Sequence, residues 1–189
     1  MASYVASAMP KKSKSAPRRI VSSAHLADNA IGGLSELEFA LSMVVNAYHR
    51  WMVRCIEASI RYTPGIGRAA LGALDVLVLH HVNHDDRAKR LVDIVLVLNV
   101  DDIHTVNYAL KKLVRVGLIE GERHGKEVFY STTARGHGLC DQYRKFRERC
   151  LIDSLTHLGN PDSAISDAAS LLRGLSGVYD QAARSAASL

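Results

Sequence analysis

The sequence lacks the features that define several common protein classes. Its 189 residues include three cysteines and four prolines, and no apolar run reaches the roughly 18 residues that a membrane-spanning helix needs. Cys55, Cys140 and Cys150 form no C-x-x-C pair, and three cysteines give no even-numbered disulfide framework. If Cys140 and Cys150 share one helix, about 15 Å of rise separates them, which is too far for a disulfide. These absences argue against a membrane protein or a disulfide-stapled secreted scaffold, and they favour a cytoplasmic location.

Recognisable catalytic motifs are also missing. The sequence has no Gly-rich phosphate loop, no G-x-S-x-G elbow and no carboxylate pair in a recognised frame. His80, His81 and His84 suggest a metal site, but no glutamate lies between them as a zinc-hydrolase motif requires, and no cysteine is close. We therefore expect no enzymatic activity, no bound metal and no cofactor.

Basic residues are present in excess, and they are unevenly distributed. The chain has 24 Lys and Arg against 19 Asp and Glu, for a net charge of +5. Residues 1–27 hold five basic and no acidic residues, and residues 104–150 hold ten basic and five acidic residues. Such segregation favours a polyanionic partner, most often nucleic acid, although a solvated surface gives the same pattern.

Long amphipathic helices are predicted near both ends of the chain. Residues 1–33 have the composition of a disordered basic arm, and a capping box of Ser35 and Glu38 predicts that a helix begins there and runs to residue 61. Its apolar positions recur at alternating steps of four and three, which favours packing along another long helix. Similar stripes predict helices over 134–158 and 162–186, and a three-helix domain is too small to cover all three. We expect these helices to form a homodimer interface.

The central part, residues 66–133, has the order of a winged helix-turn-helix. Two short helices are expected first, the second capped at its start by Asp85 and Asp86 and at its end by Asn99 in a left-handed conformation. A further helix at 102–116 is capped at its start by Asp101 and Asp102 and ends at Gly117, and two strands joined by a His124-Gly125 turn follow. Residues 34–189 are thus expected to form one domain.

The helix at 102–116 is the candidate DNA-reading element. If Ile103, Val106, Leu110 and Leu113 are buried, the helix exposes a polar face: His104, Thr105, Asn107, Tyr108, Lys111, Lys112 and Arg115. The first turn carries groups that can pair with base edges, and the second half carries cations for phosphates. At the tip of the hairpin, Arg123 and Lys126 are expected to contact phosphate. A solvated helix face, or a winged-helix protein–protein interaction module without sequence-specific DNA binding, remains the alternative.

The run from Asp101 to Ile119 resembles the recognition helix of multiple-antibiotic-resistance-regulator (MarR) proteins, and the segment at 132–136 resembles the one that follows their wing. The resemblance implies a mainly α fold, with a winged helix-turn-helix lobe, a small β-hairpin wing, and dimerisation helices at 34–61 and 134–189. It also implies a homodimeric transcriptional regulator, expected to be a repressor, that binds a palindromic operator in double-stranded DNA. Two departures are a shorter wing than is common in the family and Asn99 where a glycine is usual.

The same resemblance implies an effector site. In MarR-type proteins, small amphipathic or aromatic ligands bind where the first long helix meets the DNA-binding lobe. The residues expected near such a cleft are Tyr48, Trp51, Met52 and Cys55. The alternative is that these four side chains are dimer core.

Overall fold

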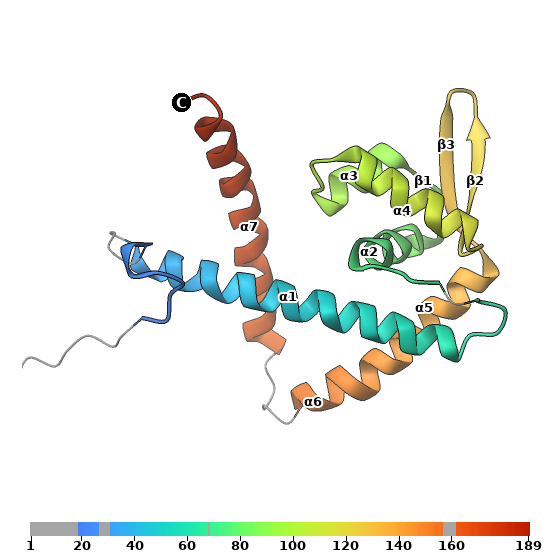
Figure 1. Ribbon diagram of the computed structural model, residues 1–189, viewed down its shortest axis with the longest axis horizontal. Helices are drawn as coiled ribbons and strands as arrows, with labels where there is room; N and C mark the ends of the chain where they lie inside the picture. The colour runs from blue at the N-terminus through green and yellow to red at the C-terminus, as the bar shows by residue number, and fades with distance from the viewer. Residues whose placement is uncertain (1–18, 27–30, 68, 157–161) are drawn as a thin grey trace, which may run out of the picture. The chain divides into compact units, whose positions relative to one another are not determined.

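The structure, a computed structural model, describes residues 19–26, 31–67, 69–156 and 162–189. It divides into two units, residues 1–49 and 50–189, which are described separately. Helices dominate, and three short strands form one antiparallel sheet (Figure 1). The mainly α fold with a small β-hairpin is therefore confirmed. In the described ranges, no helix combines the length and apolar character needed to cross a bilayer.

The first unit contains the start of the long helix α1 (Gly32–Arg61) and a 3-10 turn at Ala24–Leu26. The predicted capping role of Ser35 is wrong, because the helix already begins at Gly32. The Ser35 hydroxyl instead donates a hydrogen bond to the Leu26 carbonyl, which joins the 3-10 turn to the helix. Of the arm predicted over 1–33, residues 1–18 and 27–30 lie outside the described residues.

In the second unit, three helices form the centre of the hydrophobic core. They are α2 (Ala73–Val82), α3 (Leu91–Leu98) and α4 (Ile103–Arg115). Val106, Leu110 and Leu113 of α4 face inward as their spacing predicts and are fully buried with Val76 and Leu79 of α2. The predicted burial of Ile103 is wrong, because this residue at the start of the helix is 37% exposed. The later part of α1 joins this core through Met52, Cys55 and Ile56.

The link between α2 and α3 differs from the sequence prediction. Asp85 and Asp86 do not cap a helix; both adopt left-handed backbone conformations, with φ of 63° and 47°, within a short turn. A two-residue strand, β1 (Lys89–Arg90), follows, and Arg90 is the residue that precedes α3. The chain here forms the strand β1, which pairs with the wing, in place of the predicted aspartate cap.

The wing is a hairpin of β2 (Ile119–His124) and β3 (Glu127–Thr132), and β1 pairs with the other edge of β3. Figure 1 shows the hairpin extending beyond the helices α2, α3 and α4. Its turn is Gly125-Lys126, one residue later than predicted, because His124 still pairs with Glu127. Gly125 supplies the positive φ of 64° that the tight turn requires.

The C-terminal helices follow the wing. Thr133 caps α5 (Ala134–Arg147) by accepting the backbone N–H of Gly136, and α5 places Leu139 and Tyr143 in the core. The helix predicted over 134–158 is interrupted by a π-helical turn at Glu148–Ile152, before α6 (Asp153–Thr156). The helix predicted over 162–186 is confirmed as α7 (Asp162–Ala186).

A close backbone contact joins α5 to the base of the wing. A Cβ atom at Gly136 would lie 2.1 Å from the Leu118 carbonyl oxygen and 2.7 Å from Cγ2 of Thr132. The Thr133 backbone N–H donates to the same Leu118 oxygen at 3.1 Å, and its hydroxyl donates to the Gly117 carbonyl at 2.8 Å. Only glycine fits at position 136, so the start of α5 packs directly against the base of the wing.

We predict that Gly136→Ala lowers the free energy of unfolding by about 2 kcal/mol or more, because the added methyl must displace backbone. Gly138→Ala in the same helix is the matched control, since the nearest atom to its added Cβ, Cγ2 of Thr63, lies at an ordinary contact distance of 3.9 Å. That control is expected to be neutral or stabilising by up to about 1 kcal/mol. Urea unfolding of both variants measures the difference, and equal midpoints would contradict the proposed steric limit at position 136.

Candidate nucleic-acid interface

The outward face of α4 carries a continuous polar stripe. His104, Tyr108, Lys111 and Arg115 follow one another at steps of three and four residues, and all four are exposed. They lie opposite the buried Val106, Leu110 and Leu113 because successive residues of an α-helix turn by about 100°. Among the described residues, Lys111 and Arg115 make no ion pair. The stripe therefore offers two exposed cations and, near the helix start, an imidazole and a phenol.

The N-terminus of α4 is fixed by Asp102. Its carboxylate accepts the His104 backbone N–H at 2.8 Å, which confirms the predicted cap. The Thr105 hydroxyl donates to the Asp102 carbonyl at 2.7 Å, so Thr105 is exposed but partly engaged at the cap. This arrangement holds the first turn, where the candidate base-reading groups lie, in one conformation.

The remaining two candidates on α4 lie at the sides of the stripe. Asn107 is half-buried on one side. On the other side, the Lys112 ammonium lies 2.6 Å from Oδ2 of Asp75 in α2. Sequence spacing places Lys112 on the polar face, but its charged group turns toward the protein.

The wing carries the two predicted phosphate contacts near its tip. Arg123 and Lys126 are both exposed, and the Arg123 guanidinium donates to the Gly125 carbonyl at 3.2 Å. Acidic side chains also lie on this hairpin, and Glu122 is 3.4 Å from His124. The two cations of the wing therefore lie at or next to its turn, on a hairpin that also carries Glu120, Glu122 and Glu127.

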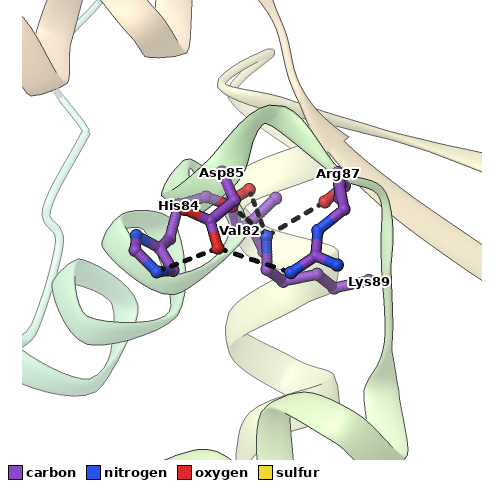
Figure 2. Close-up of polar contacts among 5 residues, drawn as sticks. All are labelled: Val82, His84, Asp85, Arg87 and Lys89. Atoms are coloured by element: carbon purple, nitrogen blue, oxygen red, sulfur yellow. Dashed lines mark hydrogen bonds and ion pairs between the residues drawn. The ribbon is translucent and has the colours of Figure 1, made fainter.

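An internal lysine organises the turn between α2 and α3 (Figure 2). The Lys89 ammonium donates to the carbonyls of Val82, His84 and Arg87, so all three of its N–H groups have acceptors. Desolvation lowers the pKa of Lys89. Because Lys89 also pairs with Tyr130 in the sheet, it ties the end of α2 to the wing.

Arg90 forms a second polar connection. Its guanidinium makes two hydrogen bonds of 2.9 Å to the Asp93 carboxylate of α3 and one of 3.1 Å to Glu127 of β3. Hydrogen bonding to Arg90 lowers the pKa of Asp93. Sequence reasoning missed both Lys89 and Arg90; the basic pair directly before an apolar helix was the only local signal.

The residues predicted for an effector site lie in different surroundings. Met52 and Cys55 are buried in the core and Trp51 packs against it, whereas Tyr48 is about half exposed and belongs to the first unit. The Cys55 thiol lies 3.7 Å from the Tyr143 carbonyl.

One histidine of α2, His80, has a packing role in the structure. His80 meets Tyr143 edge-on at 4.5 Å between ring centroids, and burial lowers its pKa. Where the structure describes the chain, no group of three or more His, Cys, Asp or Glu side chains is arranged to hold a metal ion.

Comparison with known families gives one match. Residues 71–136 match the family model of a winged helix DNA-binding domain, which covers α2 through the first turn of α5. No curated protein matches the sequence significantly. The segment that holds the polar stripe of α4 and the wing is thus a winged-helix domain.

Solved structures extend the likeness beyond that domain. A MarR variant from E. coli in complex with operator DNA is 18% identical, with a TM-score of 0.52 over 72% of this chain and 93% of that one. A MarR transcriptional regulator from Methanosarcina mazei Go1 is 16% identical, with a TM-score of 0.53 over 72% and 90%. One from Rhodococcus sp. RHA1 is 14% identical, with a TM-score of 0.52 over 74% and 91%.

The chain therefore has the fold of the MarR regulators, and the predicted resemblance is confirmed at the level of the fold. The family model describes a DNA-binding domain, and the solved structures from Rhodococcus sp. RHA1 and Methanosarcina mazei Go1 are named as transcriptional regulators.

The thiols supply a prediction about chemical reactivity. Burial raises the pKa of Cys55 to about 11 and that of Cys140 to about 12, whereas Cys150 is exposed. Since the thiolate is the reactive form, we expect iodoacetamide at pH 8 to alkylate Cys150 alone in the native protein. Peptide mass spectrometry identifies the modified site, and Cys150→Ser is expected to abolish native labelling. Labelling of Cys55 at a similar rate would contradict the burial of that side chain.

Proposed function

We propose that this protein is a DNA-binding transcriptional regulator that acts as a homodimer on a palindromic operator. The observation that carries the proposal is the exposed stripe of His104, Tyr108, Lys111 and Arg115 on a capped helix beside a β-hairpin wing. A helix of this kind fits the major groove, where residues near its N-terminus contact base edges. Lys111 and Arg115 then meet phosphates, as do Arg123 and Lys126 from the wing.

Asn107 completes the base-reading part of the proposal. It lies three residues after His104, and its amide can pair with N6 and N7 of adenine, a contact that discriminates by about 1–3 kcal/mol. His104, Thr105 and Tyr108 supply further groups in the same two turns. The half-buried position of Asn107 restricts its rotamers, which favours a fixed contact over a solvated side chain.

Exposed apolar faces on the long helices support the dimer. On α1, Met43, Val44 and Tyr48 are each about half exposed or more, at 58%, 55% and 49%. The helix α7 exposes five large apolar side chains: Ile165, Leu171, Leu172, Val178 and Tyr179. Surfaces of this kind are typical of subunit interfaces, and an obligate dimer of MarR type would bury them.

We retain a small amphipathic or aromatic effector as part of the proposal. Trp51 lies half-buried beside the core residues Met52 and Cys55, so a ligand bound there would alter the fluorescence of the single tryptophan. Repression that such a ligand relieves is the expected mode of regulation.

A protein-interaction module remains a second candidate, because one apolar patch lies within the helix-turn-helix. On α3, Val92, Leu96 and Val97 are 51%, 79% and 63% exposed. Docking of a protein on this patch would be apolar and would depend little on salt, whereas DNA binding weakens steeply with salt because counterions are released.

The first functional prediction concerns DNA affinity. Genomic fragments enriched by the protein supply the operator, and fluorescence polarisation measures binding to operator and scrambled duplexes over a salt series. Lys111→Ala and Arg115→Ala are each expected to weaken binding to both duplexes about equally. Each is also expected to reduce the slope of log affinity against log salt by roughly one unit. Asn107→Ala is expected to lose operator affinity by about 1–3 kcal/mol while scrambled binding is unchanged. Binding that does not respond to salt would refute the DNA-binding function.

A second functional prediction concerns assembly. Introducing charge into the stripe of α7 with the double substitution Leu172→Glu and Tyr179→Glu is expected to convert the dimer into monomers, because two carboxylates would be buried unpaired. Gln181→Glu, at an exposed position away from that stripe, is the control and is expected to leave the dimer intact. Sedimentation velocity at low micromolar concentration measures the change. A folded, stable wild-type monomer at that concentration would contradict the proposed dimer.

A further inference from the structure

One ion pair connects the DNA-reading helix to the helix beneath it. The Lys112 ammonium lies 2.6 Å from Oδ2 of Asp75, and the same oxygen accepts the backbone N–H of Gly72 at 2.7 Å. Asp75 is almost completely buried, with 8% of its side chain exposed, and Lys112 retains 21%. A single carboxylate oxygen thus joins the N-terminus of α2 to the second half of α4.

Stability alone does not explain this ion pair. Removing two charges from water costs several kcal/mol per ion, and replacing a buried pair with apolar side chains of similar volume is often neutral or stabilising. The best-supported use of such a pair is to specify one geometry among several that apolar packing would allow. The question is which geometry Asp75 and Lys112 specify.

An open groove lies beside the apolar contact between α2 and α4. Val106, Leu110 and Leu113 fill the core side, but the side that faces the start of α2 is a groove of about 400 Å³. Leu74 and Tyr108 lie in its wall, and both members of the ion pair line it. The directional contact at 2.6 Å between Lys112 and Asp75 lies at this groove and restrains rotation of α4 about its axis.

A small rotation there would disturb the outward stripe. Turning α4 by about 20° moves atoms that lie about 6 Å from the helix axis by roughly 2 Å. Hydrogen bonds to base edges tolerate only about 0.5 Å in length. The rotational setting of α4 therefore decides whether His104 and Asn107 reach their partners, whereas long cations such as Lys111 can follow phosphates through the movement.

We propose that Asp75 and Lys112 are a positioning pair that sets the rotation of α4, and that Lys112 does not contact phosphate. The inference rests on the proposed DNA-binding function and changes the role that sequence spacing assigns to Lys112. Sequence preference depends on the pair, while affinity for DNA of any sequence does not.

The test compares two adjacent lysines. Lys112→Met removes the charge and keeps the length of the side chain, and Lys111→Met is its exposed neighbour and matched control. Binding to operator and scrambled duplexes is measured over a salt series, together with urea unfolding. Lys111→Met is expected to weaken binding to both duplexes and to reduce the salt slope by roughly one unit. Lys112→Met is expected to lower the preference for operator about tenfold or more and to leave the salt slope and scrambled binding unchanged.

Two further variants separate positioning from stability. Lys112→Arg keeps an ion pair with Asp75 and is expected to retain most of the preference for operator. The double variant Asp75→Asn and Lys112→Met removes both charges, while the Asn carbonyl still accepts the Gly72 N–H. It is expected to unfold near the wild-type midpoint, because no buried charge is left unpaired. Its preference for operator is nevertheless expected to stay low.

Each outcome decides a different point. If Lys112→Met reduces the salt slope as much as Lys111→Met does, Lys112 is a phosphate contact and the inference is overturned. Full operator preference in the double variant also overturns it, since the pair would then serve stability only. If the wild-type protein binds neither duplex, the proposed function is overturned and this inference with it. If the wild-type protein binds normally and Lys112→Met keeps the same preference for operator, the inference alone is overturned.

Discussion

The burial of the apolar stripe of α4 against α2 is the contact on which the rest of the second unit depends. Val106, Leu110 and Leu113 are fully buried there, and this fixes which side of the helix faces solvent. The same core takes in Leu118 and Ile119 at the base of the wing and Leu139 and Tyr143 of α5. Hydrophobic burial is strong but not directional. It therefore determines which face of α4 is buried but not the exact rotation of the helix about its axis. Polar contacts at the edges of the core supply that precision.

In these polar contacts, several basic side chains around the helix-turn-helix bind groups within the protein. Lys89 binds three carbonyls, Arg90 joins Asp93 and Glu127, and Lys112 joins Asp75. Lys111 and Arg115 remain directed to solvent on α4. A count of lysines and arginines along the sequence therefore overstates the charge available to a polyanion, because internal carbonyls and carboxylates neutralise or occupy part of it.

Sequence reasoning succeeded where a local signal decides the structure. The Asp102 cap, the left-handed Asn99 and the burial of Val106, Leu110 and Leu113 depend on residues within one or two turns of each other, and all three were predicted correctly. It failed where a distant contact decides. The short strand at Lys89 exists because β3 pairs with it, and the turn of Lys112 away from solvent depends on Asp75, 37 residues earlier. Neither partner is visible in the local pattern.

The tight joint at Gly136 has a mechanical consequence for the reach of the wing. Because the Leu118 carbonyl leaves no room for a side chain at position 136, the start of α5 and the base of the hairpin move as one piece. Each strand has six residues, so the tip lies about 20 Å from this joint at ~3.3 Å per residue. A tilt of α5 by about 10° then swings the tip by about 3.5 Å, close to the ~3.4 Å between successive nucleotides of a DNA strand. A rigid joint at Gly136 would therefore make the position of the wing tip depend on the orientation of α5.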